Sequence, residues 1–240
     1  MKIYLKLGGL LLFSCLALTL SAQKSIVVDQ HAQLRNITGN FNSIKVHGSI
    51  ELFISQAETT ALAVSTGDNE GGEITTEVLQ NVLVIRSKHN GSWKNNGGRL
   101  SVYIACATLK NITVAGASKV QVAGSFSTDS LSITASGASD LKGNIAVQYL
   151  TIDLSGASDI SLSGTAAYLS INSRGASDVK GYGLAANVCT VNCSGASNVQ
   201  LTVNQRATVN LSGASAFYYK GEGDINIIQL KGSSDVKNKN

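Results

Sequence analysis

The segment Leu150-Thr151-Ile152-Asp153-Leu154-Ser155-Gly156-Ala157-Ser158-Asp159-Ile160 carries the pattern from which the architecture of this chain follows. Up to Ser155, leucine and isoleucine alternate with polar residues, and successive side chains of a strand point to opposite faces. A helix would instead need apolar residues spaced three and four apart, and this segment lacks that spacing. The segment therefore predicts a strand with one buried side, then a Gly-Ala-Ser corner and the start of a second strand.

The corner returns through the second half of the chain at nearly constant spacing. Seven glycines begin a Gly-Ala-Ser or Gly-Ser-Ser triplet: Gly116, Gly137, Gly156, Gly175, Gly195, Gly213 and Gly232. Subtracting neighbouring positions gives steps of 21, 19, 19, 20, 18 and 19 residues. Four positions before these glycines stand Ile112, Ile133, Ile152, Ile171, Val191, Val209 and Ile228. A fixed period of this length indicates a stacked repeat architecture.

One repeat cannot bury its apolar side alone, whereas stacked repeats can. Strands that pair with the equivalent strand one coil away give an all-β fold, a parallel β-helix that rises ~4.8 Å per coil. Each coil would hold about 19–20 residues, with a second glycine, as at Gly124, Gly143 and Gly164, marking a turn between two strands. The chain has no proline, 24 glycines and 5% aromatic residues, a composition typical of this fold. A β-propeller fits less well, because its blades repeat at roughly twice this period.

The N-terminus predicts a secretory signal peptide over residues 1–22. A basic start at Lys2 and Lys6 precedes an apolar run, and Ser21-Ala22 supplies the small residues of a cleavage site. In an alternative interpretation Cys15 is lipidated, but the residues after it are apolar and offer no polar tether. We therefore expect an exported protein in the periplasm, on the outer-membrane surface or outside the cell. The mature chain is expected to have no transmembrane segment.

Residues 23–240 are predicted to form a single β-helix domain. The regular repeats occupy residues 108–236. Residues 26–107 are less regular, and we expect them to form head coils that cap one end of the stack, because terminal coils must shield the core. The lysine-rich residues 237–240 are interpreted as a solvated tail.

The head contains strand-like segments and one polar insertion. The strand-like segments are Ile44–Ile54, a degenerate coil with a glycine corner at Gly48, and two further candidates, Glu77–Ser87 and Leu100–Ala105. The insertion His89–Arg99 is rich in glycine and asparagine and carries the single tryptophan, Trp93. With Lys94 and Arg99, this indole could stack on a sugar ring or enter a partner's pocket. In the alternative interpretation Trp93 folds back over the coil edge as part of the cap.

Charge and cysteine content exclude some functional classes. Loss of Lys2 and Lys6 with the leader takes the formal net charge from +4 to +2. Because no basic face is concentrated, we expect no nucleic-acid binding. Of the remaining thiols, Cys106, Cys189 and Cys193, the last two share the inward side of one strand at ~13 Å, too far for a disulfide, so we expect buried free cysteines. No cofactor motif is present.

Three residues after the corner glycines, Asp140, Asp159 and Asp178 recur on consecutive repeats, and Asn198 follows on the next. Stacking would place these side chains on one external line, where they are candidate binding residues. Oxygen ligands in a line could hold calcium weakly, but calcium normally takes six to eight oxygens from converging loops. We favour a structural role in which Asp and Asn bond their own corner backbone, and we predict no metal site.

The same line of carboxylates is the place where catalysis would have to occur. Hydrolysis of a polysaccharide would need clustered carboxylates with an acid and a base. Asp140, Asp159 and Asp178 are the sole candidates, and they repeat one structural position, whereas an active site should interrupt a repeat. The corner serines lack an adjacent base and are not activated nucleophiles. We therefore predict no catalytic residues and no enzyme, with a polysaccharide-active enzyme on the aspartate face as the alternative.

The head strand Phe41–Val46, the segment Leu109–Ser118 and the iterated Ser-Gly-Ala-Ser-Asp units resemble one known family. It is the family named putative auto-transporter adhesin, head GIN domain, a domain of unknown function. The resemblance covers nearly the whole chain after the leader. It implies a right-handed β-helix similar to pectin-lyase-like solenoids, without catalytic residues, and a role in adhesion.

From the repeat and this resemblance we expect an exported binding or adhesion module. The expected ligand is a glycan or another cell-envelope component. The alternatives are the polysaccharide-active enzyme and a structural envelope protein that stacks end to end. Edge pairing between copies is a hazard for any such stack unless both ends are covered.

Overall fold

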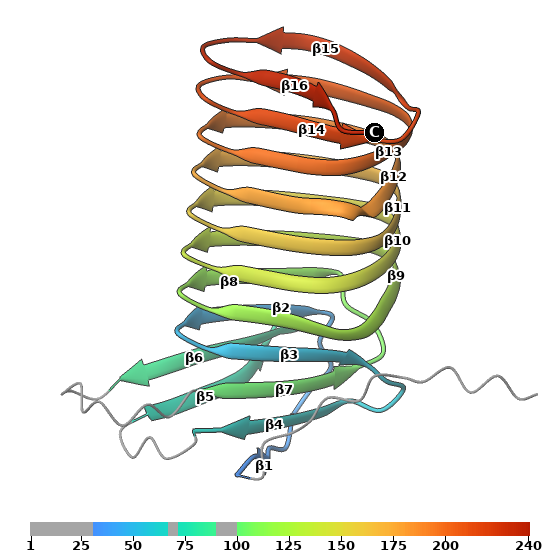
Figure 1. Ribbon diagram of the computed structural model, residues 1–240. Helices are drawn as coiled ribbons and strands as arrows, with labels where there is room; N and C mark the ends of the chain where they lie inside the picture. Colours follow the sequence, from blue (N-terminus) through green and yellow to red (C-terminus); the bar gives the residue numbers. More distant parts are fainter. Residues whose placement is uncertain (1–30, 67–71, 90–99) are drawn as a thin grey trace, which may run out of the picture.

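The computed structural model describes residues 31–66, 72–89 and 100–240 (Figure 1). Within these ranges every regular element is a strand, and the strands join in one sheet that winds as a parallel β-solenoid. The all-β class and the stacked parallel coils predicted from the repeat are therefore confirmed. The leader predicted for residues 1–22 lies outside the described residues.

The strands fall into a head and a regular stack. The head strands are β1 (Gln33–Leu34), β2 (Ser43–Gly48), β3 (Glu51–Gln56), β4 (Ala61–Ser65), β5 (Gly72–Leu79), β6 (Val82–His89) and β7 (Ser101–Cys106). The stack is formed by β8 (Asn111–Gly116), β9 (Lys119–Gly137), β10 (Asp140–Gly156), β11 (Asp159–Gly175), β12 (Asp178–Gly195), β13 (Asn198–Leu211), β14 (Ala216–Lys220), β15 (Asp224–Leu230) and β16 (Asp235–Asn238).

Neighbouring coils pair in the register that the repeat predicts. In β10 and β11, Ile152 lies beside Ile171 and Gly156 beside Gly175. The interior is narrow and filled by columns of aliphatic side chains. One such column is at most 1% exposed throughout, and it comprises Ile133, Ile152, Ile171, Val191 and Val209. Burial of this kind is the main term that stabilises the stack, because one coil covers the apolar side of the next.

The long strands differ from the predicted pair of short strands per coil. β9 to β12 run 17 to 19 residues without interruption, because the ladder to the neighbouring coil continues around the bend. The bend is taken up by irregularities in register, between Lys142 and Asn144 and between Ser161 and Ser163. A bulge of this kind bends a strand while its neighbours remain paired.

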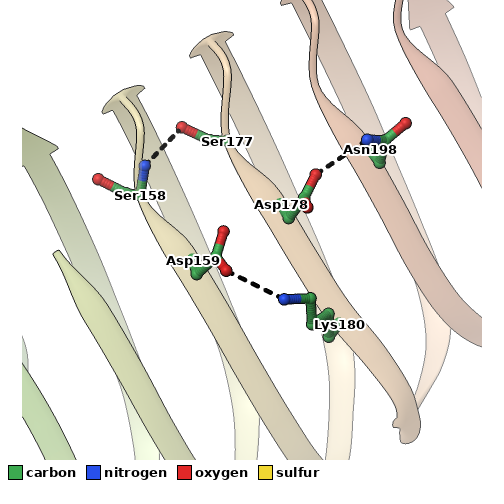
Figure 2. Close-up of polar contacts among 6 residues, drawn as sticks. All are labelled: Ser158, Asp159, Ser177, Asp178, Lys180 and Asn198. Atoms are coloured by element: carbon green, nitrogen blue, oxygen red, sulfur yellow. Dashed lines mark hydrogen bonds and ion pairs between the residues drawn. The ribbon is translucent and has the colours of Figure 1, made fainter. Parts of the chain in front are cut away.

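The serine of each Gly-Ala-Ser corner turns inward and is buried. Ser158 and Ser177 are both fully buried. The backbone N–H of Ser158 donates to Ser177 Oγ at 3.2 Å, a bond drawn in Figure 2, and the Ser177 hydroxyl lies 3.3 Å from the carbonyl oxygen of Gly156. The corner is therefore held by side-chain hydrogen bonds that link successive coils.

Two head strands, β2 and β3, form a coil that lies between other coils of the stack. β2 pairs with β8 on one side and with β6 on the other, and β3 lies between β9 and β7. Gly48 pairs with Gly116 and has a φ of 117°, so the degenerate coil predicted around Gly48 is confirmed. β6 and β7 come after β2 and β3 in the sequence but lie below them in the stack. β8 and β9 lie above them, so the coil of β2 and β3 sits between strands that all follow it in the chain (Figure 1).

Antiparallel strands lie at the N-terminal end of the stack. β5 pairs with β6, β4 with β7, and β1 with β4, all antiparallel (Figure 1). The strand predicted over Glu77–Ser87 is instead part of this hairpin, because Gln80 and Asn81 take φ values of 49° and 64° and reverse the chain. Positive φ at both central residues is the signature of the tight hairpin turn. β7 confirms the strand predicted over Leu100–Ala105.

The last coil of the stack consists of β15 and β16. β15 pairs with β13, and β16 pairs with β14. The backbone of residues 237 and 238, which were predicted to belong to a tail, lies within β16, and their side chains are exposed. Within the described ranges, no helix has the length and hydropathy needed to cross a membrane.

Candidate functional site

The structure brings Asp140, Asp159 and Asp178 onto one external line. Asp140 pairs in register with Asp159, Asp159 with Asp178, and Asp178 with Asn198. On the other side Asp140 lies beside Lys119. Figure 2 shows the upper part of this line, where the side chains project from successive coils. Like charges one coil apart repel, so the line needs compensating partners.

Those partners come from the neighbouring coil. Lys180 Nζ lies 3.0 Å from Asp159 Oδ2, and Asn198 Nδ2 donates to Asp178 Oδ1 at 2.9 Å (Figure 2). The hydrogen bond to Asp159 and the attraction of its charge raise the pKa of the Lys180 ammonium group above its ordinary value. These contacts run from coil to coil, whereas we expected from the sequence that the aspartates would bond their own corner.

The surface beside this line is only slightly hollowed. A depression of about 210 Å³ is lined by Asp178, Val179, Lys180, Asn198, Gln200 and Tyr218. Small-molecule pockets are usually larger and largely apolar, so this depression is a surface feature and not a deep substrate pocket. Among the described residues there is also no cluster of three or more His, Cys, Asp or Glu side chains that could hold a metal ion.

The buried serine hydroxyls contact backbone carbonyl oxygens, and the free thiols lie in the buried interior. The corner serines contact carbonyl oxygens of the neighbouring coil, as Ser139 does with Gly116 at 3.2 Å. The free thiols of Cys106, Cys189 and Cys193 are buried, as predicted. Burial raises the pKa of each thiol from 9.0 to about 12. At neutral pH these groups are protonated and are not nucleophiles.

The second predicted binding element, Trp93 with Lys94 and Arg99, lies outside the described residues. In the sequence its insertion stands between β6 and β7. The binding role of these three residues remains a prediction.

The register of the coils also aligns polar and aromatic side chains on another side of the solenoid. The outward side chains of residues 149–155, 168–174, 188–194 and 206–212 form one side of the solenoid, which we call the polar face. Near one margin, Tyr149 and Tyr168 stack with ring centroids 5.2 Å apart and planes inclined by 11°. The two residues are 48% and 49% exposed, which is high for large aromatic side chains.

A ladder of amide side chains runs up the same face. Asp153, Asn172, Asn192 and Asn210 occupy equivalent positions on four coils. Asn172 Nδ2 donates to Asp153 Oδ1 at 2.9 Å, and Asn192 Nδ2 donates to Asn172 Oδ1 at 3.0 Å. Each amide has two N–H donors and a carbonyl oxygen, so one ladder bond leaves hydrogen-bonding capacity for a ligand.

Between the tyrosines and this ladder lies a third column of hydroxyl side chains: Thr151, Ser170, Thr190 and Thr208. On the far side of the ladder, Arg174 helps to line a shallow depression of about 180 Å³ together with Asn172, Asn192, Asn210, Ser194 and Gln229. The polar face thus combines exposed aromatic rings, hydroxyls and amides on a regular array with coils ~4.8 Å apart.

The tyrosine pair was not predicted from the sequence, although a signal was present. Tyr149 and Tyr168 each stand seven residues before a corner glycine, Gly156 and Gly175. Equal offset within a repeat means stacking on adjacent coils, so the repeat alone would have placed the two rings together. The same reasoning applies to Asp153 and the asparagines above it.

Comparison with known proteins gives a family and a fold. The model of the family described as putative auto-transporter adhesin, head GIN domain, matches residues 40–223. No curated protein matches the sequence.

Several solved structures have the same architecture. A putative adhesin from Bacteroides fragilis superposes with a TM-score of 0.78 at 23% identity, covering 88% of this chain and 98% of that one. A putative lipid binding protein from Parabacteroides distasonis gives 0.65 at 18% identity, covering 86% and 96%. A putative adhesin from Parabacteroides merdae gives 0.58 at 16% identity, covering 88% and 98%. At these identities the likeness shows the fold alone.

Proposed function

Because the chain belongs to the family of putative auto-transporter adhesins with a head GIN domain, we propose that it is an exported binding module that adheres to glycans of a cell surface or envelope. The observation that carries this proposal is the exposed Tyr149–Tyr168 stack beside the ladder of Asp153, Asn172 and Asn192. Sugar rings present an apolar C–H face and a rim of hydroxyls, and this surface offers a partner to each.

The chemistry of the polar face fits an extended saccharide better than a compact ligand. The stacked rings offer apolar surface with few rotatable bonds, which favours binding at low entropic cost. The amides and hydroxyls can donate to and accept from sugar hydroxyls. Because equivalent groups repeat on every coil, a chain of sugars can meet the same set of contacts several times, and repeated weak contacts add to a higher avidity.

A lipid ligand is disfavoured by the interior of the solenoid. One structural relative is named a lipid binding protein, and an acyl chain would need a dry cavity or groove. Here the interior is filled by aliphatic columns that are nearly inaccessible to solvent, and the depressions described above are shallow and largely polar. We therefore place the ligand on the outer surface.

Export and the predicted insertion complete the proposal. The leader proposed for residues 1–22 would carry the chain out of the cytoplasm. Trp93, with Lys94 and Arg99, is proposed as a second contact with the ligand. The aspartate line of Asp140, Asp159 and Asp178 is proposed as a charged margin of the binding surface and not as a catalytic group.

The test is retention of residues 23–240 on a panel of immobilised glycans and cell-wall polymers, with parallel assays for released product. We expect retention without product, and the double variant Tyr149→Ala/Tyr168→Ala should lose most of it. Leu79→Ala is the matched control, because Leu79 is exposed to the same extent, 50%, and lies in β5 of the head, away from the polar face. Trp93→Ala tests the insertion separately.

Two other outcomes would replace the proposal. Product release that is abolished by Asp159→Asn would make the chain a polysaccharide-active enzyme. Neither retention nor product on any polymer would favour a structural envelope protein. Retention that survives in the double tyrosine variant would leave adhesion standing and move the site away from the polar face.

A further inference from the structure

The two ends of the stack differ in how their outermost strands are paired. At the N-terminal end, β5 pairs antiparallel with β6, and β4 with β7, so strands of reversed direction close the parallel coils. At the C-terminal end, β15 pairs only with β13 and β16 only with β14 among the described residues (Figure 1). The last coil therefore presents a row of unpaired backbone N–H and C=O groups, which is a template for another strand.

This end also exposes apolar side chains. Ile227, Ile228 and Leu230 of β15 are 45%, 67% and 44% exposed, and they stand among the few large hydrophobic residues of the described chain with such exposure. Ile225 and Val236 of the same coil pack against the core but are only partly covered. Solenoids usually end in a polar capping repeat, whereas the last coil of the described residues exposes these apolar side chains.

The sequence of β15 is complementary to itself when reversed. A two-fold axis between Ile227 and Ile228 places Asp224 opposite Lys231 of a second copy, Ile225 opposite Leu230, and Asn226 opposite Gln229. Ile225 and Leu230 lie beside the buried Ala207 and Leu211, so both face inward, because the register against β13 shifts by one residue between Ile227 and Gln229. Asn226 and Gln229 lie beside Thr208 and Asn210, so both face outward. Opposite residues of an antiparallel pair share a side of the sheet, and the apolar pair and the amide pair both meet that requirement.

We propose that the C-terminal coil is a homodimerisation surface, on which β15 of one copy pairs antiparallel with β15 of a second copy. The two-fold axis would lie across the end of the solenoid, so β16 would also face β16 of the second copy, and the two solenoids would stack end to end. One surface that serves both partners is the rule for two-fold dimers. Between Asp224 and Lys231 the strand has no charged residue, so nothing in its centre opposes pairing.

The charges at the ends of β15 give a sharp test by sedimentation velocity on residues 23–240. In a dimer of the Asp224→Lys variant, the introduced lysine lies opposite Lys231 of the second copy. In a dimer of the Lys231→Asp variant, the introduced aspartate lies opposite Asp224. Each variant alone should therefore dimerise at least about tenfold more weakly than the parent chain, because like charges meet at both ends of the strand pair.

An equimolar mixture of the two variants restores attraction at one end of the strand pair. There the two introduced side chains, a lysine on one copy and an aspartate on the other, lie opposite each other. At the other end the unchanged Lys231 of the first variant lies opposite the unchanged Asp224 of the second. Opposite charges thus meet at both ends, and we expect the mixture to form dimers that contain one copy of each variant.

A second measurement, disulfide cross-linking, tests the register of the proposed pairing between the two copies of β15. In the double variant Asn226→Cys/Gln229→Cys, each new cysteine lies opposite the other on the second copy, whereas within one chain they are three residues apart and ~10 Å distant. We expect an interchain disulfide under oxidising conditions. Tyr149→Cys, on the polar face, is the control and should not cross-link.

Three results would overturn the proposal. They are a parent chain that is monomeric at all concentrations, variants whose mixture is no more dimeric than either alone, and assemblies that grow beyond dimers with concentration. Glycan retention of the monomeric Asp224→Lys variant, measured separately, keeps this proposal distinct from the proposed adhesion.

Discussion

Gly175 lies directly over Gly156 at the corner of the solenoid, and a Cβ atom on Gly175 would come 2.5 Å from the carbonyl oxygen of Gly156. The contact recurs up the corner, where each repeat glycine approaches the backbone of the one below. Gly175 also has a φ of 105°, a conformation that residues with a Cβ rarely adopt. Two separate constraints therefore reserve this column for glycine, and the column sets how closely the coils approach at the corner.

Gly175→Ala should accordingly destabilise the fold by more than about 2 kcal/mol, because the strain of positive φ adds to a clash with rigid backbone. Gly124→Ala is the matched control. Gly124 also has positive φ, 71°, but no atom lies within 4 Å of its virtual Cβ, so we expect a loss of about 1 kcal/mol. Urea unfolding of both variants measures the difference. Equal losses would show that φ alone, and not the close approach, constrains the corner.

The regular stack could be predicted from the sequence because its information is local and repeated. The alternation around Ile152 and the constant offset to Gly156 determine which side chains face inward and which neighbours they meet. The insertion of the β2–β3 coil between later coils could not be predicted, because it depends on long-range pairing of Gly48 with Gly116. No local pattern distinguishes that order from a sequential stack.

The candidate site, too, could be predicted from the sequence only in part. The line of Asp140, Asp159 and Asp178 follows from the repeat, and so does Lys180 as a candidate to offset its charge, but the pairing across coils does not. Lys180 lies two residues after Asp178, yet its ammonium group pairs with Asp159 of the coil below. Which carboxylate a lysine reaches depends on the side-chain conformation, which the repeat does not determine. The Tyr149–Tyr168 stack follows from the same periodicity as the aspartate line, since both tyrosines hold one offset from the corner glycine, but we had not predicted it.

The buried serine column predicts a second effect on stability. Ser177→Ala removes the acceptor of the Ser158 N–H, which is buried, so we expect a loss of about 1–2 kcal/mol. Ser234 occupies the equivalent position in the last corner but is only partly buried, and water can replace its bond to the Lys231 carbonyl oxygen. Ser234→Ala should therefore change the free energy of unfolding by less than about 0.5 kcal/mol. Similar losses in the two variants, measured by urea unfolding, would contradict a role for burial.

Asn198→Asp tests whether the aspartate line is limited by repulsion. The change replaces the amide donor to Asp178 with a fourth carboxylate, and we expect a loss of about 0.5–1 kcal/mol in low salt. In about 1 M salt the Debye length falls to about 3 Å, so most of the electrostatic part of the loss should disappear. Asn198→Ser removes the same hydrogen bond without adding charge and should show a smaller dependence on salt. If Asn198→Asp instead stabilised the chain when calcium is added, the line would be a cation site.

The three buried thiols predict how stability falls at alkaline pH. Burial raises the pKa of Cys106, Cys189 and Cys193 from 9.0 to about 12 in the folded chain, whereas the unfolded thiols ionise near their ordinary value. Between these values the folded state holds protons that the unfolded state has released. Stability is therefore unaffected by the thiols below about pH 9 and declines as the pH rises toward 12, by up to about 1.4 kcal/mol per thiol for each pH unit.

The triple variant Cys106→Ala/Cys189→Ala/Cys193→Ala separates this effect from the titration of tyrosine and lysine. It should be less stable than the parent at neutral pH, because each buried sulfur leaves a small cavity. Its free energy of unfolding, measured by urea titration at several pH values, should nevertheless fall less steeply above pH 9. Parallel slopes for the two chains would mean that the thiols ionise in the folded state, and that water reaches the interior of the solenoid far more readily than its packed columns indicate.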